Sequence, residues 1–204
     1  MRKHEKTYYH HNSADDSPIA LILHPHPQQG GTMNNKLCFN MFNMFKDRGY
    51  SVMRFNFRGV GRSQGVYDQG IGELSDAASA LDWMQTYNAN ARATWVAGYS
   101  FGSWIGMQLL MRRPEIDGFV CVAPPASEYD FTFLAPCPSS GLMIHGTQDS
   151  NIPLASVNKL ADKLNSQKGI EVDLRTIDGA DHYFAKQQDD VIKHTAAYLE
   201  KRGA

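Results

Sequence analysis

The sequence predicts an α/β fold with a mostly parallel central sheet, helices on both faces and no cap domain. Apolar runs of strand length recur along the chain, and most are nearly continuous, as expected for strands buried on both faces. Segments with helical periodicity lie between them, and such alternation indicates crossover units and a parallel sheet. The runs are residues 20–23, 51–57, 94–98, 118–123, 142–145 and 172–177.

Helical spacing of apolar residues separates most of these runs. The first helix is expected over residues 37–46, with Asn34 or Asn35 as its cap and Gly49 just beyond its end. The helix after Ser100 is apolar nearly all round, which predicts a central helix packed against the sheet. Further helices are expected around residues 74–84, 154–164 and 192–199.

Composition favours one domain over residues 1–204. The formal charge of -1 gives no basic surplus for nucleic acid and no charged tail for an electrostatic partner. Three cysteines without a CxxC spacing argue against a disulfide framework and a zinc knuckle, which favours a reducing cytoplasm. No segment reaches the roughly 18 apolar residues of a membrane span, so a soluble, unprocessed protein without membrane partners is expected.

Residues 98–102, Gly-Tyr-Ser-Phe-Gly, match the G-x-S-x-G pattern of a nucleophile elbow. The pattern follows a predicted strand and precedes a predicted helix, and small flanking residues avoid collisions in such a sharp turn. The N-terminus of the following helix would also stabilise negative charge. Ser100 is therefore the candidate nucleophile, with a structural serine in a tight turn as the alternative.

A serine hydroxyl needs a base to take its proton and a third group to hold that base. When the three residues occur along the chain in the order Ser, Asp, His, the aspartate follows a strand and the histidine follows the last strand. Asp149 and His182 occupy these two places and are the candidate acid and base. The alternative acids follow an earlier strand or lie near the histidine: Glu128, Asp130, Asp178 and Asp181.

Five other histidines lie outside the position that a base requires. His4, His10 and His11 are expected to precede the sheet. His145 is expected within or at the end of a strand, and His194 in the final helix. His182 is therefore the best placed base.

The negative oxygen of a tetrahedral intermediate needs two N–H donors. One is expected from Phe101, directly after the nucleophile, and the other from the loop after the first parallel strand. Pro25 and Pro27 in that loop have no N–H, so His26 is the natural second donor, with Gln28 behind it.

Two further patterns suggest ligands but are incomplete. His24 and His26 alternate on an extended stretch and could share a metal ion, yet no third ligand has a convincing spacing. Residues 59–65 are glycine-rich, but the last glycine comes one place too late for a dinucleotide loop. A tight turn with Arg58 and Arg62 packing or pairing locally is favoured, and neither a metal nor a cofactor is expected.

Several long motifs in one order resemble the α/β-hydrolase superfamily. More narrowly, they look like the small, lidless bacterial α/β-hydrolases related to dienelactone hydrolases and X-Pro dipeptidyl-peptidase-like proteins. The likeness runs from about Tyr8 to Leu199, and it is carried by LHPHPQQGGTMNNK, RFNFRGVGRSQG, GELSDAASALDW, AGYSFGSW and APPA.

This resemblance implies esterase-like activity and the same roles for Ser100, Asp149 and His182. It also implies that residues 58–65 form a turn bordering the site. Residues 145–153, HGTQDSNIP, depart from the expected pattern because uncharged residues flank the acid. A dienelactone hydrolase would carry cysteine at position 100, so Ser100 disfavours that substrate.

The sequence thus predicts a serine hydrolase that cleaves a small carboxylic ester, or a thioester or amide, through an acyl-enzyme. A non-catalytic hydrolase-fold protein that binds a ligand or partner is the alternative, and acyl transfer or perhydrolysis also stays open. A homodimer through a sheet edge is a further arrangement left open. Residues 124–140 hold four of the nine prolines and are expected to form a loop over the sheet edge. The aromatic residues of this loop belong either to the core or to a surface that contacts the substrate: Tyr129, Phe131 and Phe133.

Overall fold

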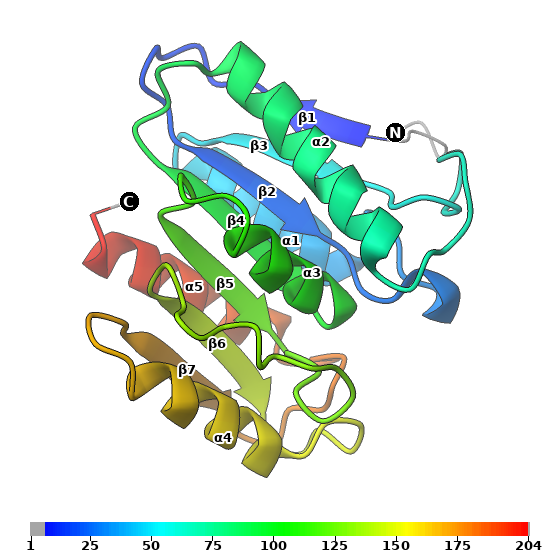
Figure 1. The fold of residues 1–204 in the computed structure, drawn as a ribbon, viewed down its shortest axis with the longest axis vertical. Helices are drawn as coiled ribbons and strands as arrows, with labels where there is room; N and C mark the ends of the chain where they lie inside the picture. The colour runs from blue at the N-terminus through cyan, green and yellow to red at the C-terminus, as the bar shows by residue number, and fades with distance from the viewer. Residues whose placement is uncertain (1–6, 204) are drawn as a thin grey trace.

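A seven-stranded sheet runs through the computed structural model, which describes residues 7–203 (Figure 1). The order across the sheet is β1-β3-β2-β4-β5-β6-β7. All neighbouring strands are parallel except β1 and β3, which confirms the mostly parallel sheet. The strands are β1 (Thr7–His10), β2 (Ile19–Leu23), β3 (Ser51–Phe55), β4 (Thr94–Tyr99), β5 (Gly118–Val122), β6 (Gly141–Gly146) and β7 (Val172–Ile177).

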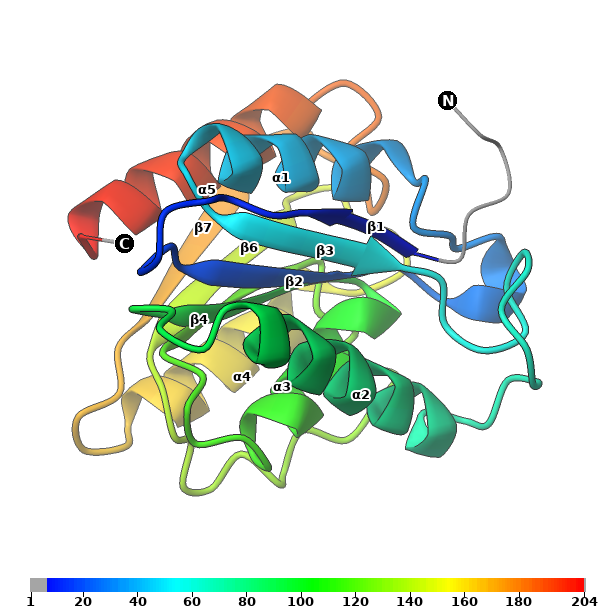
Figure 2. The same ribbon diagram turned by 90° about the horizontal axis from the view of Figure 1, so that it is seen from above.

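Helices cover both faces of the sheet, as predicted. Figure 2 shows α1 and α5 on one face and α2, α3 and α4 on the other. Within residues 7–203 no insertion forms a cap, and no helix has the length and apolar character needed to cross a membrane. The helices are α1 (Lys36–Asp47), α2 (Ile71–Tyr87), α3 (Phe101–Leu110), α4 (Leu154–Asn165) and α5 (Gln188–Lys201), with a 3-10 turn, η1 (Pro27–Gln29).

Strand β2 explains why the apolar runs are continuous. Ile19, Leu21 and Leu23 point into the core beneath α2, α3 and α4, whereas Ala20 and Ile22 join the core beneath α1 and α5. Side chains alternate between the two faces of a strand, and here both faces are covered. Every position in the strand is therefore apolar.

The central position predicted for α3 is confirmed. Eight of its ten residues are buried, and the helix packs on β4, β5 and β2 while also contacting α2. A Cβ atom on Gly106 would lie 3.0 Å from a methyl carbon of Val96. The absence of a side chain at Gly106 therefore lets the helix lie close to the sheet.

The local signals at the ends of α1 act as the sequence predicts. The Asn35 side chain accepts hydrogen bonds from the amides of Leu37 and Cys38, which otherwise lack partners at a helix N-terminus. Gly49 follows the helix with a φ of +82°, a conformation that glycine adopts readily. These two residues fix where the chain leaves and re-enters the sheet.

The first strand was not predicted, and the placement of His10 before the sheet is wrong. His10 lies in β1, which pairs antiparallel with β3 at the sheet edge. Its half-exposed pattern gives no apolar run that would reveal a strand. Strand β3 ends at Phe55, whereas the sequence predicted an end at residue 57. Residues 124–140 contain neither a helix nor a strand, as predicted.

The chain reverses its direction of winding between β2 and β4. The loop after β2 leads to α1 on one face, while the turn after β4 leads to α3 on the other (Figure 2). Adjacent parallel strands whose connections diverge in this way leave a crevice at their carboxyl ends, where ligands bind in open α/β sheets. The topology therefore points to the ends of β2 and β4.

Candidate active site

Ser100 lies in the turn between β4 and α3. Its φ of +52° and ψ of -121° fall in a region that residues with side chains avoid, at a cost of about 1–3 kcal/mol. The Ser100 N–H donates to the Val122 carbonyl at 2.8 Å, and the Ser100 carbonyl accepts from the Ser103 amide and hydroxyl. These bonds fix the strained turn from both sides.

The flanking glycines are required by close backbone approach. A Cβ on Gly98 would lie 2.3 Å from the Gly102 carbonyl oxygen, and a Cβ on Gly102 would lie 2.3 Å from that of Leu23. Real Cβ atoms do not come this close to backbone atoms, so neither position accepts a side chain. The turn at Ser100 can therefore pack directly on the end of β2.

A row of hydrogen bonds joins three candidate residues. His182 Nδ1 lies 2.7 Å from Asp149 Oδ2, and His182 Nε2 lies 3.1 Å from Ser100 Oγ. An ionised carboxylate only accepts hydrogen bonds, so the ring proton lies on Nδ1. Nε2 is then free to accept the proton of the Ser100 hydroxyl.

Asp149 is buried and held by the backbone as well as by His182. Its Oδ1 accepts from the amides of Asn151 and Ile152, each at 2.8 Å. Burial alone would raise the pKa of the Asp149 carboxyl, but these hydrogen bonds and the one from His182 outweigh it and lower the pKa below its usual value. The carboxylate is therefore charged at neutral pH.

The loops after β6 and β7 pack tightly together, and this brings Asp149 and His182 into contact. A Cβ on Gly146 would lie 2.2 Å from the Ala180 carbonyl oxygen, which also accepts from the Gln148 amide. The Tyr99 hydroxyl donates to the His182 carbonyl at 2.9 Å. Tyr99 thus ties the strand before Ser100 to the loop that carries His182, a contact that sequence reasoning missed.

The alternative acids do not bond to His182 within the described residues. Asp130, Asp178 and Asp181 accept hydrogen bonds from neighbouring loop residues instead, and Glu128 is exposed. Of the carboxylates considered from the sequence, Asp149 alone contacts the ring.

A cavity of about 100 Å³ opens beside Ser100 and His182. Uncharged polar side chains share its wall with the two residues, among them Gln29, Asn35 and Asn151. None of its lining residues is acidic, lysine or arginine. The cavity therefore suits a small, uncharged group.

One candidate N–H donor directly follows Ser100, and the other lies in the loop after β2. Phe101 is the first residue of α3, so its N–H has no acceptor within the helix. His26 lines the cavity, and its ring packs against Phe101 and Tyr67. Burial lowers the pKa of the His26 ring, although Glu128 and Glu73 oppose the shift.

His24 and His26 do not form a metal pair. His24 Nε2 accepts from the Phe57 amide at 3.0 Å, and its Nδ1 lies 2.6 Å from the Pro25 carbonyl oxygen. His26 Nδ1 accepts from the Gln28 amide. No group of three potential metal-ligating side chains occurs in residues 7–203, and the three cysteines are free and buried.

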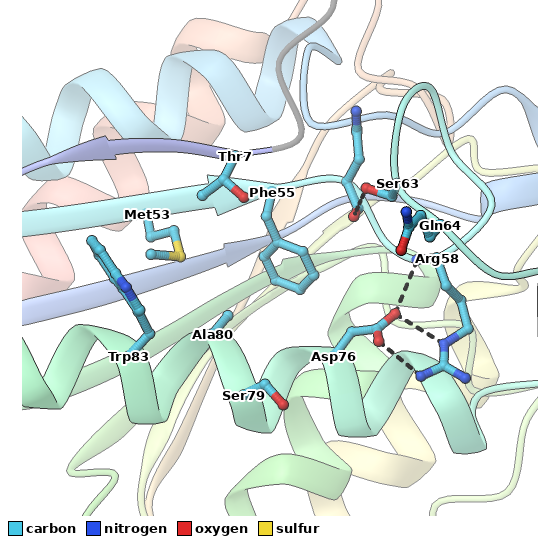
Figure 3. Close-up of a pocket in the computed structure, with 11 residues that line it drawn as sticks. Thr7, Met53, Phe55, Arg58, Ser63, Gln64, Asp76, Ser79, Ala80 and Trp83 are labelled. Atoms are coloured by element: carbon cyan, nitrogen blue, oxygen red, sulfur yellow. Dashed lines mark hydrogen bonds and ion pairs between the residues drawn. The ribbon is translucent and has the colours of Figure 1, made fainter.

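Residues 59–65 form a turn, and Arg58, which precedes it, pairs with Asp76 of α2 rather than within the turn. The Asp76 carboxylate accepts from the Arg58 amide and from two guanidinium nitrogens at 2.8–3.1 Å, as Figure 3 shows. Arg62, by contrast, is exposed and has no ion pair within the described residues. Arg58 and Asp76 line a larger cavity of about 520 Å³ with Phe55 and Trp83, which contains none of the candidate catalytic residues.

Two protein-family models match this chain. The model of the X-Pro dipeptidyl-peptidase (S15) family matches residues 3–136. The model of the prolyl oligopeptidase family matches residues 124–202. The first match alone spans more than half of the sequence.

Individual relatives agree with these family matches. An uncharacterized protein from Rickettsia prowazekii is 47% identical over 191 residues, which are 92% of this chain and 80% of that protein. A solved structure from Agrobacterium tumefaciens, of unknown function and described as a candidate α/β hydrolase, is 55% identical with a TM-score of 0.94, covering 96% of this chain and 90% of that chain. A lidless α/β serine hydrolase from Xanthomonas campestris is 26% identical with a TM-score of 0.85, covering 96% and 88%.

Proposed function

Because this chain belongs to the X-Pro dipeptidyl-peptidase (S15) family and has the lidless α/β-hydrolase fold, we propose that it hydrolyses small carboxylic esters through an acyl-enzyme on Ser100. The observation that carries the proposal is the hydrogen-bonded row from Ser100 Oγ through His182 to Asp149. This row joins a nucleophile, a base and a group that orients the base.

The chemistry follows from the positions of the protons. Ser100 Oγ adds to the ester carbonyl carbon while its proton moves to His182 Nε2. Asp149 stabilises the resulting imidazolium, and the amides of Phe101 and His26 donate to the negative oxygen. When the tetrahedral intermediate collapses, Nε2 returns the proton to the leaving alcohol. Water then repeats the sequence on the acyl-enzyme and releases the acid and free Ser100.

The lining of the small cavity favours an ester as substrate over a peptide that is recognised by its free amino terminus. An exopeptidase that recognises a free amino terminus needs a carboxylate to pair with the ammonium group. The cavity beside Ser100 has no acidic lining residue. Its volume of about 100 Å³ also favours a short acyl group or a small alcohol over a long chain.

The first test is a pre-steady-state experiment with chromogenic esters from acetate to octanoate. Wild type should release a burst of about one mole of alcohol per mole of enzyme and should hydrolyse the short esters fastest. Ser100→Ala should lose the burst and at least about 10³-fold in kcat, because the nucleophile is gone.

Ser79→Ala is the matched control, because Ser79 lines the larger cavity and its hydroxyl donates to the Ser75 carbonyl within α2. This variant should keep the burst and the turnover. Undiminished hydrolysis by Ser100→Ala would overturn the mechanism. Failure of wild type both to hydrolyse the esters and to react with a fluorophosphonate would favour a non-catalytic binding protein.

A further inference from the structure

His24 stands at the end of β2 with both ring nitrogens engaged by the backbone. Because the Phe57 N–H donates to Nε2 at 3.0 Å, Nε2 cannot carry a proton in the neutral ring. The single ring proton must then lie on Nδ1. Burial lowers the pKa of His24 to about 4, although the Pro25 contact opposes the shift, so the ring is neutral at neutral pH.

The Nδ1 proton is donated to the carbonyl oxygen of Pro25, 2.6 Å away. That carbonyl and the N–H of His26 belong to one peptide unit, which is trans. In a trans peptide the C=O and N–H point in opposite directions within one plane. A side chain that fixes the direction of the Pro25 carbonyl therefore also fixes the direction of the His26 N–H.

The other neighbours of this peptide leave it little freedom. A Cβ on Gly31 would lie 2.0 Å from the Pro25 oxygen, so the backbone of Gly31 packs directly against that carbonyl. The His26 carbonyl accepts from the amides of Gln29 and Gly31, each at 3.0 Å. His26 N–H, in contrast, donates to no group in residues 7–203, and His26 lines the cavity beside Ser100.

We propose that His24 is a positioning residue that aims the His26 N–H at the oxygen that becomes negative when Ser100 attacks. The inference deepens the proposed function and rests on it. A donor held in place before the reaction stabilises the transition state more than the bound substrate. Loss of His24 should therefore lower kcat and leave KM nearly unchanged.

The two bonds of the ring can be tested separately. In His24→Asn the side-chain amide lies where Nδ1 lies and can still donate to Pro25, but nothing reaches the Phe57 amide. In His24→Gln the amide lies near the position of Nε2 and can accept from Phe57, but the donor to Pro25 is lost. We expect His24→Asn to keep kcat within about threefold and His24→Gln to lose about 10²-fold, at the lower end of the loss for a missing donor.

The same ester assay provides the controls. Thr195→Val removes a buried hydroxyl that donates to the Val191 carbonyl within α5 and does not line the cavity beside Ser100, and should leave kcat unchanged. Circular dichroism and thermal unfolding of each variant establish that it is folded. Equal losses in His24→Asn and His24→Gln, no loss in either, or a larger loss in His24→Asn would each overturn the proposal.

A measurement on unaltered protein keeps the proposal testable if these variants fail to fold. The ¹⁵N shifts of labelled histidines distinguish a ring protonated on Nδ1 from one protonated on Nε2. A neutral His24 ring with its proton on Nε2 would overturn the inference. A wild-type protein without esterase activity or fluorophosphonate labelling would overturn the proposed function instead, so the two failures are distinct.

Discussion

The cavity beside Ser100 and the cavity beside Arg58 differ in size and in the use of their polar groups. The first measures about 100 Å³ and the second about 520 Å³. In the larger cavity, the Arg58 guanidinium donates to the Asp76 carboxylate, and the wall also contains apolar side chains such as Phe55 and Trp83 (Figure 3). In the smaller one, a row of bonds begins at buried Asp149 and ends on a hydroxyl.

The larger of the two cavities is therefore not the one that holds the candidate nucleophile. A carboxylate that is paired with a guanidinium has its charge neutralised where it stands. A carboxylate that orients a histidine toward a hydroxyl instead makes the hydroxyl oxygen more nucleophilic. Identical substitutions in the two cavities should therefore have different consequences.

The largest contrast is expected from changing each aspartate to asparagine. In Asp149→Asn the side-chain amide can donate to His182 Nδ1, which moves the ring proton to Nε2. A protonated Nε2 can no longer accept the proton of the Ser100 hydroxyl. We expect kcat to fall about 10³–10⁴-fold, measured with the best ester substrate. A fall of less than tenfold would contradict the role of Asp149.

A smaller contrast is expected in the pH dependence of stability. The folded pKa of His24 is about 4, against an ordinary value of 6.5, so between these two pH values the unfolded chain binds a proton that the folded chain does not. The stabilising contribution of the neutral ring should therefore be fully present above pH 6.5, and the free energy of unfolding should fall by on the order of 3 kcal/mol as the pH drops to 4. Urea titrations at several pH values would measure this loss.

In His24→Gln the unfolding free energy should change less steeply with pH over the same range, because the titrating ring is absent. The difference in slope from wild type should correspond to the uptake of up to one proton on unfolding. Asp76→Asn should keep the wild-type slope between pH 7 and pH 5, since no histidine lines the larger cavity. Equal slopes in wild type and His24→Gln would show that His24 does not contribute to this pH dependence.

The smallest effect is expected from Asp76→Asn itself. The Arg58–Asp76 pair is partly exposed, so solvent weakens the interaction and its loss should cost only about 1 kcal/mol of unfolding free energy. The value of kcat should stay within about threefold of wild type, since no candidate catalytic residue lines this cavity. A large loss of turnover would show that the two cavities are coupled.

Most of the fold could be predicted because five of its seven strands, β2 to β6, are buried along their whole length. The predicted run 172–177 coincides with β7, and each of the other apolar runs differs from its strand by one or two residues in total. Strand β1 was missed because its residues are only half covered and its pairing with β3 is a tertiary property. A short polar segment at a sheet edge carries no periodic signal.

The candidate site was predictable as a set of residues but not as a geometry. The order of elements identifies Ser100, Asp149 and His182, and the structure brings them into hydrogen-bond contact. Their catalytic roles, and those of the amides of Phe101 and His26, stay predictions. The parts played by His24 and Tyr99 could not be seen because each bonds to backbone atoms of another loop.

Glycine at position 100 would adopt the left-handed backbone of this turn without the strain that Ser100 bears. Thermal resistance and reactivity therefore favour different residues at the same place. A screen of random variants for heat tolerance alone would enrich glycine there and discard the hydroxyl. Engineering of this protein for robustness thus needs a second selection, for covalent labelling of the serine, applied in the same round.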